Sequence, residues 1–147
     1  IKEKNMDFTE IFTDLFLGTE LNKTKFANQL GIGHSTIQKY LNGVIPSPKT
    51  IAKICDYFNC SMDYIVGLTN DFNYKNSKGG IDSKCFIPEY QRLLTINSTN
   101  HFTLSKKGLV NESSLSWWKK GHLPQFEVIF NIAYELGGSI DKLLGRI

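Results

Sequence analysis

The chain of 147 residues has little of what several protein classes require. No apolar run approaches the roughly 20 residues of a membrane-spanning helix, and the mean hydropathy is −0.22. Three cysteines make a poor disulfide framework and are fewer than the four ligands of a structural zinc site. The first residues are charged and lack the apolar stretch of a secretory signal. We therefore expect a cytoplasmic protein that enters no membrane and needs no metal or other cofactor.

Acidic residues are missing from one long stretch of the chain. Between Leu21 and Lys53 there is no Asp or Glu, although the net charge of the whole chain is only +3. The basic residues of this stretch are Lys23, Lys25, Lys39, Lys49 and Lys53. Such a split is typical either of two differently solvated faces or of a surface without acids that meets phosphate groups. Composition alone leaves both interpretations open.

The chain aligns with itself, without a gap, at an offset of 78 residues. Phe12–Gly67 then stands against Tyr90–Gly145 with ten identical pairs, where background composition would produce about three. We call this alignment the 78-residue register. It predicts two related domains of about 65 residues, near the lower size limit for independent folding. The expected boundaries are 1–68 and 87–147, with a polar, partly flexible linker at 69–86.

Each half has the pattern of several short helices, and no segment alternates with the period of a strand. In the first half, apolar residues recur at helical spacing from Phe8 to Phe16. Gly31 and Gly33 suit a tight turn, with positive φ available at both, before a helix over about 34–42. The residues suited to cap later helices are Asn22, Ser47 and Ser61. The predicted fold class is all-α, with five helices in each half.

A helix, a glycine-containing turn and a second helix have the spacing of a helix-turn-helix. The first half carries a longer pattern: Phe26-Ala27-x-x-Leu30-Gly31-Ile32, Thr36-Ile37-x-x-Tyr40-x-Asn42-Gly43, Pro46-Ser47-x-x-Thr50-Ile51-x-x-Ile54 and Ser61-x-Asp63-Tyr64-Ile65-x-Gly67. This pattern resembles the Cro-like and phage-repressor-like helix-turn-helix family, also called XRE. Leu41 departs from it, because the family often has Glu there. The second half resembles a degenerate copy, with Gly108 one place earlier than Gly31.

The resemblance implies two tandem lambda-repressor-like domains that bind double-stranded DNA, with the third helix of the first domain in the major groove. By position, the base-reading candidates are His34, Ser35, Gln38 and Lys39. The phosphate candidates are Asn22, Lys23, Asn42 and Lys49. Lys39 can donate to guanine O6 or N7, and Ser35 can pair with several base edges. For any single residue, a place on a solvated polar helix face is the alternative.

The second half differs most at Trp117, which stands in the 78-residue register where the first half has Lys39. If Trp118 fills the core position of Tyr40, Trp117 points outward. Exposed aromatic side chains are more typical of protein interfaces than of base reading. The candidates of this half, for a protein interface or for DNA, are Ser113, Trp117, Lys119 and Lys120. A protein interface is the favoured interpretation.

These patterns predict a sequence-specific DNA-binding transcriptional regulator, most simply a repressor. The alternative is a protein-interaction module, such as an antirepressor or antitoxin, that uses the helix-turn-helix frame to bind a protein. No Ser/His/Asp or Cys/His arrangement stands out, and the three histidines have no metal-ligand spacing, so we expect no enzyme. The sequence leaves open whether the chain forms a homodimer and whether a regulatory protein binds it.

Overall fold

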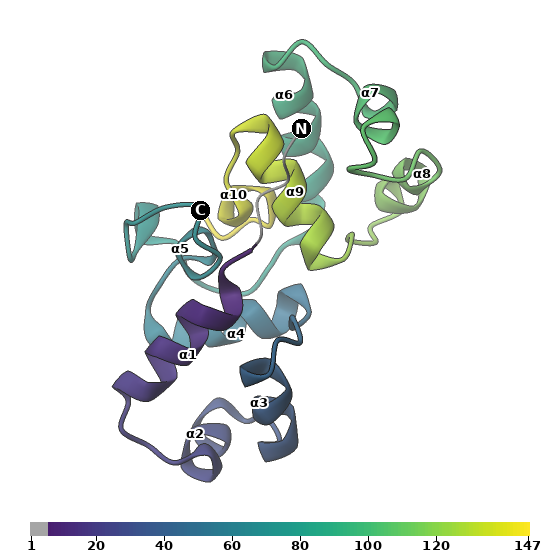
Figure 1. Ribbon diagram of the computed structural model, residues 1–147. Coiled ribbons are helices and arrows are strands. Elements are labelled where there is room, and N and C mark those ends of the chain that lie inside the picture. Colours follow the sequence, from purple (N-terminus) through teal and green to yellow (C-terminus); the bar gives the residue numbers. More distant parts are fainter. Residues whose placement is uncertain (1–5) are drawn as a thin grey trace. The chain divides into compact units, whose positions relative to one another are not determined.

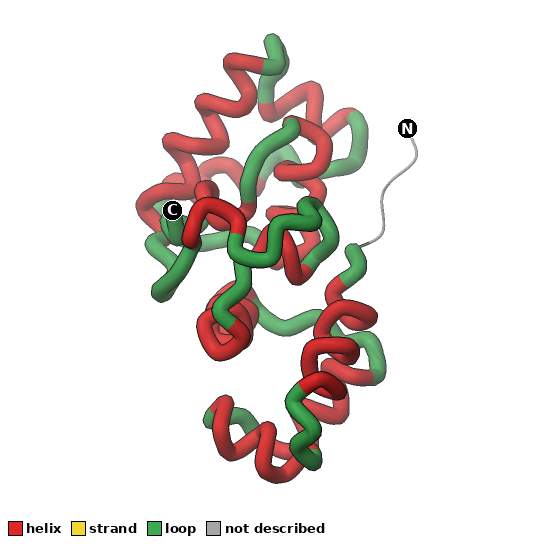
Figure 2. Tube along the Cα trace, turned by 90° about the vertical axis from the view of Figure 1, so that its left-hand side faces the viewer, coloured by secondary structure: helices red, strands yellow, loops and turns green. Residues whose placement is uncertain are grey.

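The computed structural model describes residues 6–147, which contain ten α-helices, two short 3-10 helices and no strand (Figures 1 and 2). The all-α prediction is therefore confirmed for the described part of the chain. Residues 1–5 lie outside it, and they include most of the N-terminal segment in which we expect no secretory signal. Among the described helices, none has both the length and the hydropathy that crossing a membrane requires. The described residues divide into two compact units, Met6–Gly79 and Gly80–Ile147.

The first unit contains five α-helices whose ends follow the local sequence. They are α1 (Phe8–Gly18), α2 (Lys23–Leu30), α3 (His34–Leu41), α4 (Pro48–Phe58) and α5 (Met62–Ile65). The three predicted caps are confirmed, because the side chain of each accepts a hydrogen bond from a backbone N–H three residues later; they are Asn22, Ser47 and Ser61. Gly31 ends α2 with φ +68°, whereas Gly33 has φ −63°. Only the first of the two glycines in this turn thus uses positive φ.

Aromatic side chains of α1, α2 and α3 pack against one another in the core of the first unit. On α1, Phe12 and Phe16 place their rings 5.9 and 4.9 Å from the ring of Phe26 on α2. Tyr40 of α3 meets Phe12 edge-on at 6.3 Å, and Ile37, one turn earlier, is fully buried. Each buried aromatic or aliphatic side chain contributes about 1.5–3 kcal/mol relative to leaving it exposed. This packing orients α3, so that its opposite face points to solvent.

The second unit repeats the helix order of the first. Its helices are α6 (Phe86–Ile96), α7 (His101–Lys106), α8 (Ser114–Lys119), α9 (Phe126–Leu136) and α10 (Ile140–Leu143). Three of them, α6, α9 and α10, begin and end 78 residues after α1, α4 and α5. The other two are shorter than their counterparts, with six residues each where α2 and α3 have eight. The differences between the units are therefore concentrated in α7 and α8.

The core of the second unit is also aromatic. Trp118 is 6% exposed and lies edge-on to Phe86 and Tyr90 of α6, with ring centroids 5.5 and 5.7 Å apart. It fills the position that Tyr40 fills in the first unit. Trp117 is 55% exposed, as expected for the residue beside a buried Trp118 on a helix.

The polar segment 69–86, expected to be a linker, is held to one unit or the other along much of its length. In the first unit, the backbone N–H of Ser61 donates to the carbonyl of Phe72, and the N–H of Gly79 donates to Asp56 Oδ1. A 3-10 helix, η1 (Tyr74–Asn76), lies between these two contacts. In the second unit, 3-10 helix η2 (Ser83–Cys85) leads directly into α6, which has Pro88 in its first turn. Composition does not reveal such bonds, because their partners are distant in the sequence.

Candidate nucleic-acid interface

The outward face of α3 carries most of the predicted base-reading residues. Ser35, Gln38, Lys39 and Asn42 follow one another at i, i+3, i+4 and i+7, which places them along one side of the helix. Gln38 is half-buried and the other three are exposed. His34 is exposed in the first turn, where the N-cap is Gly33 and no side chain caps the helix. The structure thus places all four base-reading candidates on exposed or half-exposed positions of one short helix.

A chain of hydrogen bonds joins α2 to this face. Lys23 Nζ, in the first turn of α2, donates to Gln38 Oε1, and Gln38 Nε2 donates to Asn42 Oδ1 at 3.1 Å. The ammonium group holds the amide oxygen of Gln38, so the orientation of this side chain is set before any ligand arrives. Two phosphate candidates and one base-reading candidate therefore form one connected group. Sequence spacing did not predict this contact, because 15 residues separate Lys23 from Gln38.

Asn22 is both a predicted helix cap and a phosphate candidate. Its side-chain oxygen accepts a hydrogen bond of 2.8 Å from the backbone N–H of Lys25, and so caps α2. The side-chain amide nitrogen of Asn22 is still a donor that can meet an anion. Asn22 is exposed and next in sequence to Lys23, so both lie at the N-terminal end of α2. A helix N-terminus favours negative charge, which suits a phosphate group.

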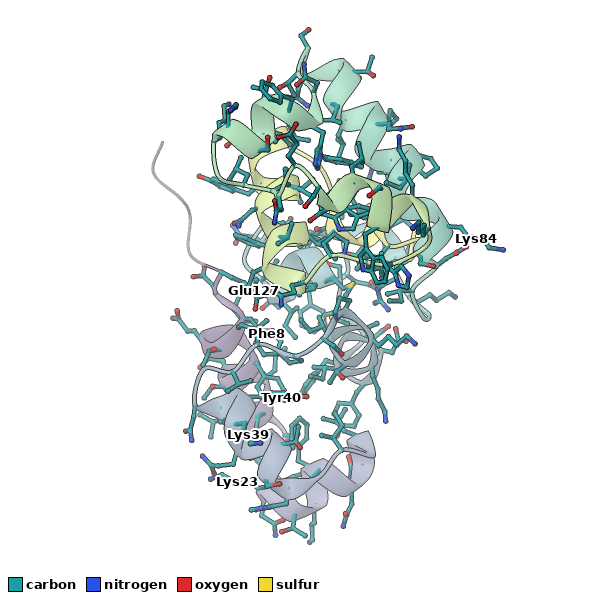
Figure 3. The ribbon with its side chains drawn as sticks, turned by 90° about the vertical axis from the view of Figure 1, so that its right-hand side faces the viewer. Phe8, Lys23, Lys39, Tyr40, Lys84 and Glu127 are labelled. Atoms are coloured by element: carbon teal, nitrogen blue, oxygen red, sulfur yellow. The ribbon has the colours of Figure 1, made fainter. Side chains whose placement is uncertain are left out.

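The lysines of the acid-free stretch differ in their environments. Lys23 and Lys39 lie toward the same edge of the first unit, while Phe8 and Tyr40 lie further inside (Figure 3). Lys49 is exposed in the first turn of α4. Lys53, not among the candidates, donates from Nζ to the carbonyl of Gly31 at 3.4 Å. Among the described residues, none of these lysines forms an ion pair with a carboxylate.

The second unit replaces Lys23, in the 78-residue register, by a buried histidine. His101 is 8% exposed, and its Nδ1 lies 2.7 Å from the hydroxyl of Tyr90. Its Nε2 lies 3.0 Å from the carbonyl of Asn111, to which it donates, so Nδ1 accepts from Tyr90. Burial raises the pKa of the Tyr90 hydroxyl, which favours the protonated donor. Both ring nitrogens of His101 therefore have partners inside the second unit, and the side chain is not placed to contact a phosphate group of DNA.

The predicted candidates of the second unit all lie at or beside α8. Ser113 lies at the N-cap position of the helix without a side-chain capping hydrogen bond, and Lys119 and Lys120 are exposed at its C-terminal end. The indole of Trp117 stacks on the ring of His122, with centroids 3.6 Å apart and planes 6° from parallel.

Lys119 and Lys120 also line an open pocket of about 410 Å³. Its lining residues are Ser83, Lys84, Ile87, Trp118, Lys119, Lys120 and Gly121. Sequence analysis missed Lys84, which projects outward from the second unit (Figure 3). Within the described residues, no three His, Cys, Asp or Glu side chains are placed to hold a metal ion.

Comparison with known proteins identifies part of the first unit. Residues 19–65 match a family model described as helix-turn-helix, which covers the chain from α2 to α5. This stretch is a helix-turn-helix domain of the XRE type, so the resemblance seen in the sequence is confirmed there. No such match is found for the second unit. No curated protein and no solved structure matches the chain.

Proposed function

We propose that the chain is a transcriptional regulator that binds double-stranded DNA through its helix-turn-helix domain. The observation that carries this proposal is the polar face of α3, with Lys39 at its centre and Lys23 joined to it through Gln38. A helix with its polar face exposed fits the major groove, and the nearby lysines suit the two phosphate backbones. A helix-turn-helix domain is typical of regulators that are not enzymes, which agrees with the absence of any catalytic pattern from the sequence.

Within this interface, base reading falls to His34, Ser35, Gln38 and Lys39. Phosphate contact falls to Asn22, Lys23, Asn42 and Lys49. The bond from Lys23 to Gln38 links the two functions, because one cation can bind a phosphate oxygen while it orients an amide that faces the bases. Repression is the simplest output, since a protein that occupies the major groove at a promoter excludes other proteins from it.

We also propose that the second unit is a related copy of the first, so that the domains are arranged in tandem. The helix bounds support this, because α6, α9 and α10 coincide with α1, α4 and α5 in the 78-residue register. So does Trp118, which packs as Tyr40 does. The copy has diverged where the first unit would meet DNA, and this divergence accounts for a family match to one unit only.

The second candidate function is protein interaction by the second unit. It rests on Trp117, which is 55% exposed where the first unit has Lys39. A large exposed aromatic side chain in place of a cation suits a protein surface better than a phosphate backbone.

Selection of bound sites from a pool of randomised duplexes, with the full chain, tests the proposed function. We expect one enriched site and a dissociation constant that rises steeply with salt. A variant with Lys23, Lys39 and Lys49 replaced by Ala should lose binding. The matched control is Lys78→Ala, which removes an exposed lysine of the same unit that lies outside this interface. If the chain slows no duplex in a gel-shift assay even at low salt, it is not a DNA-binding regulator.

A further inference from the structure

The outward side of α8 forms a continuous exposed stripe. Ser113, Ser116, Trp117 and Lys120 follow one another at i, i+3, i+4 and i+7, and all four are exposed. Ser113 has helical backbone angles, φ −73° and ψ −13°, so it continues the same spiral. The stripe therefore presents one large apolar ring beside two small hydroxyl side chains.

The ring of this stripe is held in place before it meets a partner. Trp117 stacks on His122 at 3.6 Å, and Trp118 beside it is buried in the core. An anchor that is already ordered loses less conformational entropy on binding than a mobile one. This arrangement favours an interface in which Trp117 is the central contact.

The charges at the two ends of the stripe are opposite. Glu112 lies just before the N-terminal end of α8, and Lys119 and Lys120 lie at the C-terminal end; all three are exposed. Glu112 and Lys120 are eight residues apart in the sequence and flank the six-residue helix α8 on its two sides. The midpoint between them is Ser116, a small residue that permits close approach of another helix.

We propose that α8 packs antiparallel against α8 of a second copy of this chain, and so forms a symmetric homodimer. An antiparallel pair centred at Ser116 places Glu112 of each copy opposite Lys120 of the other. It also places each indole over the small side chains of Ser113 and Ser116 of the second copy. The surface at a two-fold contact must be complementary to itself. This stripe is self-complementary in charge, through Glu112 and Lys120, and in shape, through Trp117 and the two serines.

The same features disfavour DNA as the occupant of this surface. Glu112 repels phosphate groups, and His101 is buried where the first unit has Lys23. In addition, α8 begins two residues later than α3 does in the 78-residue register, so Glu112, at the position of His34, falls before the helix. A nucleic acid would therefore meet an incomplete reading helix and one repelling carboxylate.

Such a dimer carries two first units, one from each copy. If the proposed function holds, the dimer presents two reading helices to two half-sites of one operator, which a single copy does not. This consequence rests on the proposed function, whereas the α8 contact itself does not.

Sedimentation of the full chain over a range of concentrations, without DNA, tests the contact. We expect the wild type to dimerise and Trp117→Ala to raise the dissociation constant of the dimer by about 30-fold or more. Tyr134→Ala is the matched control, since it removes another exposed aromatic side chain of the same unit, on α9, and should leave association unchanged.

Charge reversal tests the antiparallel register and separates a lost contact from a damaged fold. Glu112→Lys alone and Lys120→Glu alone should each weaken the dimer roughly three- to tenfold, because like charges then meet. The two reversals together should restore the wild-type constant, since they exchange the ends of the pair. Circular dichroism of each variant checks that the helices remain.

Three results would overturn the proposal. The first is a chain that stays monomeric up to about 100 µM at low salt, a range that includes weak interfaces. The second is a double reversal as weak as the single ones. The third is a full-length Trp117→Ala variant that keeps its oligomeric state while it loses affinity for a duplex, which would assign this surface to DNA. If the chain is a monomer that still binds its selected duplex, only this inference is overturned. If the chain is a dimer that binds no duplex, only the proposed function is overturned.

Discussion

Lys23 of α2 donates a hydrogen bond to the side-chain oxygen of Gln38 on α3. This bond connects the two helices of the helix-turn-helix directly, whereas in the core Phe26 of α2 and Tyr40 of α3 both pack on Phe12 of α1. The first unit thus holds α2 and α3 together by an apolar core and by a cation–amide contact. The second unit has no equivalent of the cation, because His101 is turned into its core.

Lys39 should contribute sequence preference rather than general affinity. We expect Lys39→Ala to weaken binding to the selected site by about 1–3 kcal/mol and to relax the preference at one base position. The physical reason is that its ammonium group stands on the exposed side of α3, where it can donate to a guanine edge. Titration against the selected duplex and its single-base variants measures both effects. An equal loss on every sequence would make Lys39 a phosphate contact.

Lys23 should contribute general affinity and, through Gln38, part of the specificity. We expect Lys23→Ala to weaken binding to selected and random duplexes together, and to reduce the slope of log K against log salt by about one. Because Lys23 also orients Gln38, the Lys23→Ala and Gln38→Ala effects should be non-additive by about 0.5 kcal/mol or more on the selected site. A double-mutant cycle measures this coupling, and a salt slope equal to that of the wild type would remove Lys23 from the interface.

Phe26 should be essential for the stability of the first unit. It is fully buried, and its ring meets rings of α1 and α4. We expect Phe26→Ala to lower the free energy of unfolding by about 3–5 kcal/mol, since the truncation leaves a cavity among rigid rings. Leu17→Ala is the control, because Leu17 is 63% exposed. Denaturant titration measures both variants, and similar losses in the two would contradict this account of the core.

Glu89 should make the second unit sensitive to acid. Hydrogen bonds of 2.7 Å from Arg92 lower the pKa of the buried Glu89 carboxyl below its ordinary value of 4.5. Because the folded-state pKa is lowered, ionised Glu89 stabilises the unit above about pH 4.5. That contribution is lost as the pH falls through the folded-state pKa. We expect the melting temperature of Glu89→Gln to decrease less between pH 4.5 and lower pH than that of the wild type. Glu127→Gln is the control, because Glu127 is exposed, and it should change this pH dependence much less.

Helix positions follow from local chemistry, so the sequence predicts them well. The caps Asn22, Ser47 and Ser61 bond to backbone groups three residues away, within the reach of a sequence pattern. The 78-residue register also predicts the bounds of α6, α9 and α10 from those of the first half. The exposure of Trp117 beside a buried Trp118 follows in the same way, because neighbouring residues on a helix face different directions.

The amino-acid sequence by itself determined the all-α class, the helix-turn-helix of the first unit and the face of α3 on which its polar residues lie. Only the tertiary structure decided which of those residues contact one another. Lys23 meets Gln38 across 15 residues, and His101 turns inward because Tyr90 and Asn111 supply its two hydrogen-bond partners. Such contacts depend on how whole helices pack, and helix packing is set by buried side chains far apart in the chain. A local pattern records which groups a segment offers, whereas the packed core determines which of them meet.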